Sequence, residues 1–193
     1  LGCMRPTSAE RGFLINFLTL MLTPVGEALP IKDAAAIASI LLDELYTKCA
    51  EDEQTVFDDG QDSTVTQWLH NQRDFEIKKK TTWWQIVFFA MSKKAYDIAA
   101  SAQRFAVPNL KMLPAQLTMS NTIRSLYGGN TENPTLMEAR WLLLGFINQY
   151  SSLCKPSTYN FQETDVCIID LNKVTQDTGP EGTRRTSIAY MVS

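Results

Sequence analysis

The first predicted helix of the chain is apolar on nearly every side. Thr7 followed by Glu10 has the spacing of a capping box, and an apolar run at residues 13–22 comes directly after it. We therefore expect a helix over residues 8–23, ended by Pro24. Such a helix requires cover, either in the chain's own core or on a neighbouring molecule.

A second helix is predicted between Pro30 and Cys49, because apolar residues recur there at helical spacing. Asp43 and Glu44 fall on its outer side. Residues 51–63 are acidic and contain turn formers, which predicts a loop. The aspartates of this loop lack the ligand spacing of a calcium-binding loop, so a solvated loop is the favoured interpretation.

Further helices are predicted in the second half of the chain. Residues 81–104 form a long apolar pattern that begins with a capping threonine, and we expect them to be the central core helix. A shorter helix is predicted over residues 117–127, and we expect it to end at Gly128 in a left-handed cap. Asn133 then caps a helix that continues to Tyr150.

The pattern changes beyond Pro156. Helical periodicity disappears, and two β-prone runs remain, at residues 166–171 and 187–192, separated by a stretch rich in Gly, Pro and Thr. We expect an extended tail that becomes ordered on a neighbouring molecule.

The length of the chain favours one core. Its 193 residues, 45% of them hydrophobic, are enough for one sizeable core and few for two stable domains. The predicted fold class is all-α, with a single helical core domain over residues 31–155. An N-terminal arm with one apolar helix covers residues 1–30, and an extended C-terminal tail covers residues 156–193.

Charge is distributed unevenly along the chain, although the net charge is only −3. Residues 1–72 carry −7, residues 73–155 carry +6 and residues 156–193 carry −2. A basic middle segment suits a polyanion such as nucleic acid, and the acidic segment beside it suits head-to-tail contact between copies. The alternative is that folding mixes these charges into an ordinary surface.

Residues with catalytic or metal-binding chemistry are sparse. His70 is the only histidine, and Cys3, Cys49, Cys154 and Cys167 form no CxxC pair. Neither a zinc site nor a dense disulfide framework is predicted, and a reducing, intracellular setting is favoured. No nucleotide-binding or metalloprotease motif is present. We therefore expect no enzymatic activity, no metal and no cofactor.

The apolar run at residues 13–22 is about half as long as a bilayer-spanning helix. We expect no contact with a membrane and predict that this helix docks onto protein. The predicted docking residues are Phe13, Leu14, Phe17, Leu18 and Met21.

The basic middle segment contains the candidate RNA contacts. Basic side chains neutralise phosphates without reading sequence, and aromatic side chains such as Trp83 and Trp84 stack on bases. The candidate phosphate contacts are Lys78, Lys79, Lys80, Lys93, Lys94, Arg104, Arg124 and Arg140. Burial in the core is the favoured alternative for the two tryptophans, because they lie on the most apolar predicted helix.

Short motifs occur here in the same order as in a known family. They are Trp83-Trp84-Gln85-Ile86 with Ala95-Tyr96-Asp97-Ile98, then Tyr127-Gly128 with Asn133 and Ala139-Arg140-Trp141. In order and spacing they resemble the coat proteins of flexuous filamentous plant viruses of the potyvirus kind. The resemblance covers about one third of the chain.

The pocket residues of that family do not carry over. The family has an arginine before its Gln-Ile pair and an aspartate in an Ala-Phe-Asp-Phe motif, and both help to form its RNA pocket. Trp84 and Leu144 stand at the corresponding positions here. The absence of both the arginine and the aspartate is physically coherent, because either charge alone would be buried without a partner. The tail beyond Pro156 also differs from the family's ending.

The resemblance implies a viral coat or nucleocapsid protein, found in the virion and in the host cytoplasm. Such a protein binds single-stranded RNA non-specifically and polymerises into a helical filament, with terminal arms that contact neighbouring copies. The expected partners are single-stranded RNA and copies of the chain itself. The alternative is a helical interaction or effector domain that binds a host protein without nucleic acid.

Overall fold

The computed structural model describes residues 6–51, 55–128, 133–154 and 179–192. These residues are helical apart from turns, loops and an isolated antiparallel bridge between Val56 and Thr82. In chain order the α-helices are α1 Ser8–Met21, α2 Ala34–Glu51, α3 Ser63–His70, α4 Trp83–Ser92, α5 Tyr96–Ala106, α6 Leu113–Met119, α7 Asn121–Leu126, α8 Pro134–Gln149 and α10 Pro180–Val192. Short 3₁₀ helices are η2 Leu110–Met112 and η3 Ser151–Cys154. The predicted all-α class is confirmed.

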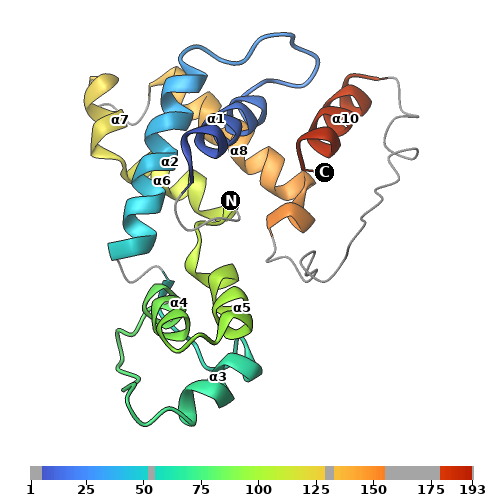
Figure 1. Cartoon of the computed structure of the whole chain (residues 1–193). Coiled ribbons are helices and arrows are strands. Elements are labelled where there is room, and N and C mark those ends of the chain that lie inside the picture. The colour runs from blue at the N-terminus through green and yellow to red at the C-terminus, as the bar shows by residue number, and fades with distance from the viewer. Residues whose placement is uncertain (1–5, 52–54, 129–132, 155–178, 193) are drawn as a thin grey trace.

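The buried residues form two separate hydrophobic clusters, and these divide the molecule into two lobes (Figure 1). The first lobe contains α1, α2, α6, α7, α8 and α10, and the second contains α3, α4 and α5. The division does not coincide with the predicted boundaries at residues 30 and 155. Instead, the middle of the chain leaves the first lobe after α2 and returns to it at η2 (Figure 1).

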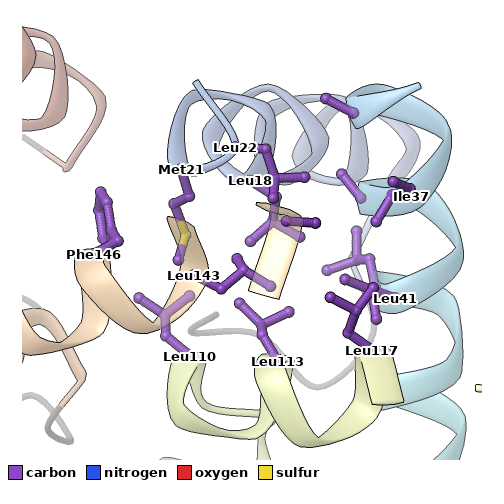
Figure 2. Packing of buried hydrophobic residues seen from close by; sticks show 14 of the residues in the cluster. Leu18, Met21, Leu22, Ile37, Leu41, Leu110, Leu113, Leu117, Leu143 and Phe146 are labelled. Atoms are coloured by element: carbon purple, nitrogen blue, oxygen red, sulfur yellow. The ribbon is translucent and has the colours of Figure 1, made fainter. Parts of the chain in front are cut away.

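The core of the first lobe lies between α1, α2, α6 and α8. In Figure 2, Leu18 of α1 and Leu22, directly after α1, lie on the same side of the core as Ile37 of α2, and Leu113 of α6 lies below them. Phe17 packs edge-on against Phe146 of α8, with ring centroids 5.9 Å apart. At the outer side, Arg11 of α1 binds Asp43 of α2. These contacts make α1 an integral part of the first lobe.

The predicted docking residues are therefore largely unavailable to a neighbouring molecule. Leu14, Phe17, Leu18 and Met21 are buried in the first cluster, and only Phe13 is exposed, at 44%. The sequence allowed burial either in the chain's own core or on a neighbour, and the structure shows the former. The reason is that α2 and α8 together offer an apolar surface that covers α1.

The long helix predicted over residues 81–104 is two helices, α4 and α5. The chain turns at Lys94, which has a φ of 57°. Ala95 N–H donates to the Ala90 carbonyl oxygen at 2.9 Å and Lys94 N–H to that of Met91 at 3.0 Å, the hydrogen bonds of a Schellman cap. The turn lets α5 fold back onto α4, where the small residues Ala99, Ala102 and Ala106 are buried. Because a lysine occupies the left-handed position, the sequence carried no glycine signal for this break.

Three other predictions require correction. The helix predicted over residues 117–127 is interrupted at Ser120, whose side chain caps α7 by accepting from Ile123 N–H at 3.0 Å. The β-prone run at residues 187–192 lies inside α10, where Arg184 and Ile188 are buried one helical turn apart. Glu44 was expected to face outward, but it accepts a hydrogen bond from Ser120 Oγ at 2.9 Å. The run at residues 166–171 lies outside the described residues.

Among the described residues, no helix combines the length and the hydropathy needed to cross a bilayer.

Candidate nucleic-acid interface

The basic residues predicted to contact RNA are distributed over both lobes. Five lysines and Arg104 lie in the second lobe, whereas Arg124 is in α7 and Arg140 in α8 of the first lobe. Residues 55–109, which contain the second lobe, carry seven Lys and Arg against six Asp and Glu, a net charge of +1. Folding therefore distributes the basic block of the sequence without producing a strongly basic lobe.

Two arginines among the predicted contacts, Arg104 and Arg124, are engaged within the molecule. Arg104 forms an ion pair with Asp62, with Nη2 and Oδ2 3.0 Å apart. The other oxygen of Asp62 accepts from the Thr64 and Val65 amides and so caps α3, which joins α5 to the start of α3. Arg124 Nε donates to the Thr118 carbonyl oxygen at 3.0 Å. Both arginines hold the fold together locally, and a phosphate would have to compete with these bonds.

The lysines lie at both ends of α4. Lys78, Lys79 and Lys80 come before the helix, and Lys93 and Lys94 follow it. Lys78 pairs with Glu76 at 3.3 Å, and Lys93 hydrogen-bonds to Asp74. The bond from Lys93 holds the pKa of Asp74 below its ordinary value. Exposed pairs of this kind contribute little to stability, so a phosphate can replace the carboxylate at small cost.

The two adjacent tryptophans at the start of α4 differ in burial. Trp83 is almost fully buried, stacks on Phe105 with centroids 4.6 Å apart, and donates from Nε1 to Gln61 Oε1 at 2.9 Å. Trp84 is half-buried and lies against Phe88, with centroids 5.6 Å apart. The favoured alternative of core burial therefore holds for Trp83.

A stripe of surface side chains, which the sequence did not reveal, runs along α4. Trp84, Phe88 and Met91 recur at i, i+4 and i+7, and Phe88 and Met91 are 49% and 50% exposed. Periodicity could not find them, because almost every residue of α4 is apolar and both faces look alike in the sequence. We call Trp84, Phe88 and Met91 the α4 stripe. With the lysines at either end, it combines surface aromatic residues with positive charge.

Residues that correspond to the potyviral pocket lie far apart in the fold. Trp84 is in α4 of the second lobe, and Leu144 is in α8 of the first (Figure 1). On α8, Arg140 and Trp141 are both exposed, Trp141 at 71%. A second surface with an aromatic and a basic side chain therefore exists on the first lobe.

Comparison of the chain with protein-family models, with curated proteins and with solved structures gave no match. The coat-protein resemblance accordingly remains a prediction from the motifs.

Other kinds of site find little support among the described residues. No group of three or more His, Cys, Asp or Glu side chains is placed to hold a metal ion there. Burial raises the pKa of Cys49 to about 11, and burial also raises the pKa of Cys154. Both thiols therefore stay protonated near neutral pH and are poor nucleophiles. His70 lies exposed at the end of α3.

Proposed function

We propose that the chain is a coat or nucleocapsid protein that binds single-stranded RNA without sequence preference and assembles with copies of itself. The observation that carries this proposal is the α4 stripe, in which Trp84 and Phe88 lie on the surface between lysines at both ends of the helix. Aromatic faces stack on any base, and lysines neutralise phosphates, so this combination suits non-specific single-strand binding.

The positive charge beside the stripe is accessible. Lys79 and Lys94 are exposed, and their side chains make no hydrogen bond or ion pair with the residues that the structure describes. Lys94 lies at the turn after α4, and Lys79 lies in the loop before it. A strand that follows the stripe would meet a cation at each end.

The first lobe offers a surface for contacts between copies. Met137 and Trp141 are one turn apart on α8 and are 47% and 71% exposed. Large exposed aromatic residues are enriched at protein interfaces. We assign this face of α8 to self-assembly, and leave RNA binding to the second lobe.

The test measures the binding of a fluorescently labelled oligouridine by anisotropy over a series of salt concentrations. The double variant Trp84→Ala/Phe88→Ala should weaken binding about tenfold or more, because base stacking contributes ~1–3 kcal/mol per base. Lys79→Gln and Lys94→Gln should each lower the slope of log affinity against log salt by about 0.7. Trp141→Ala, which removes a more exposed tryptophan on the other lobe, is the control for RNA affinity.

Electron microscopy of the same samples tests assembly. Filaments or rings that lengthen with RNA and dissociate in high salt are expected, and Trp141→Ala should shorten them while RNA affinity is retained. If oligouridine does not bind even at low salt, the RNA proposal is wrong. The exposed apolar residues would then favour the other candidate function, a helical domain that binds a host protein.

A further inference from the structure

A cavity of about 560 Å³ lies where the loop after α1 meets α10. It is lined by Leu20, by residues 23–28, and by Pro180, Thr183, Arg184 and Ser187. Gly26, with a φ of 85°, turns this loop toward Pro180. Cavities of this size hold small ligands. The cavity lies between the α1 end and α10 of the first lobe, whereas the α4 stripe belongs to the second lobe. Figure 1 shows these helices.

Arg184 in the cavity wall is a buried cation without a counter-charge. Arg184 is only 9% exposed, and its guanidinium lies over the ring of Phe146, 5.4 Å from the centroid. Nη2 donates to the Met21 carbonyl oxygen at 3.3 Å, but Nε has no hydrogen-bond partner. No carboxylate among the described residues forms an ion pair with it. A buried charge in this state is costly, and an anion would remove that cost.

The other polar groups of the cavity also suit an anion. The residues Thr23, Thr183 and Ser187 line it, and the hydroxyl of each now donates to the carbonyl oxygen four residues earlier, at 3.0, 3.3 and 3.0 Å. A hydroxyl rotates to donate to a ligand at little cost. Pro180 and Thr183 belong to the first turn of α10, where the helix dipole favours negative charge. Glu27 is the one acidic residue of the lining, and it is exposed.

We propose that this cavity binds a phosphate group, with the Arg184 guanidinium as its counter-charge. Guanidinium matches phosphate geometry through paired N–H donors, and the hydroxyls supply further donors. The phosphate belongs either to a small molecule or to an RNA backbone, and the chemistry of recognition is the same for both. The inference does not depend on RNA binding at the α4 stripe, because the two sites lie in different lobes.

The test titrates the 193-residue chain with inorganic phosphate and with adenosine monophosphate at constant ionic strength. Binding is measured by calorimetry and by the line width of the phosphorus resonance. Saturable binding is expected for at least one of the two. Arg184→Gln should weaken it at least about tenfold, since hydrogen bonds to charged groups are among the strongest. Arg184→Lys, which keeps the charge but loses the paired donors, should weaken it less.

A variant outside the buried core guards against loss of folding. Glu27→Lys changes an exposed residue of the lining and should tighten phosphate binding several-fold by replacing a repulsive charge with an attractive one. Trp84→Ala/Phe88→Ala should leave phosphate binding unchanged. Displacement of bound phosphate by oligouridine would assign the site to an RNA backbone, and lack of displacement would assign it to a small molecule. Absence of saturable binding of either titrant, or binding that Glu27→Lys does not alter, would overturn the proposal.

Discussion

Glu44 joins three helices through one carboxylate. It lies on α2, accepts from the buried Gln116 of α6 through Nε2, and accepts from Ser120 Oγ at 2.9 Å, where Ser120 caps α7. Gln116 and Ser120 are 3% and 2% exposed. Because water hardly reaches these two side chains, Glu44 is the acceptor for their hydrogen bonds. A single charged residue therefore decides whether two buried polar groups have a hydrogen-bond partner.

At the residue scale we therefore expect Glu44→Ala to lower the free energy of unfolding by about 2 kcal/mol or more, because it leaves buried polar groups without their acceptor. Urea denaturation followed by circular dichroism measures the change. Glu138→Ala, an exposed helical glutamate of α8, is the matched control and should change stability by less than about 0.5 kcal/mol. Equal effects of the two substitutions would contradict a structural role for Glu44.

At the scale of the element, α4 separates a buried face from an exposed one. Its start is fixed by a capping box, in which Thr82 and Gln85 bind each other's backbone amides. Trp83, Ile86, Val87 and Ala90 then face the core of the second lobe, while the α4 stripe faces outward. Capping determines where the helix begins, and the packing of α5 against it determines which side is covered.

Substitution of the two neighbouring tryptophans tests this division. Trp83→Ala should lower the free energy of unfolding by ~3–5 kcal/mol, because it empties a packed site and leaves Gln61 without its donor. Trp84→Ala should lower it by less than about 1 kcal/mol and act on RNA affinity instead. Chemical denaturation measures both. A similar loss of stability in the two variants would mean that the stripe is part of the core.

At the scale of the whole molecule, the two hydrophobic clusters predict two units that unfold with some independence. Val107, Pro108 and Asn109 lead from α5 of the second lobe to η2 of the first, and Thr55 Oγ1 donates to the Cys49 carbonyl oxygen where the chain leaves α2. Contacts between the two lobes are few, whereas the helices inside each lobe pack closely on one another. Local opening follows such boundaries.

Hydrogen exchange read by mass spectrometry tests that independence. Ile86→Ala, in the second cluster, should accelerate exchange in α3, α4 and α5 more than in α1, α2 and α8, and Leu41→Ala, in the first cluster, should do the reverse. Each substitution removes a fully buried aliphatic side chain and should cost ~2–5 kcal/mol. If both variants accelerate exchange everywhere alike, the molecule unfolds as one cooperative unit.

Helix starts were predictable because capping acts between residues that are close in sequence. Thr7 with Glu10, and Asn133 before Pro134, occupy the expected positions in the structure. The all-α class followed from the same local patterns. The break at Lys94 was not predictable, because lysine rarely takes the left-handed conformation and only the packing of α5 on α4 makes it favourable here.

The sequence by itself determined the helical class, the starts of α1, α4 and α8, and the presence of basic and aromatic residues in the middle of the chain. The tertiary structure alone decided which of two adjacent tryptophans is buried, that α1 is covered by the chain's own core, and that Arg184 meets Met21 across a separation of 163 residues. The physical reason is the separation along the chain of the residues that interact. Capping depends on hydrogen bonds within a few residues, whereas burial depends on which distant surfaces meet after the chain has folded.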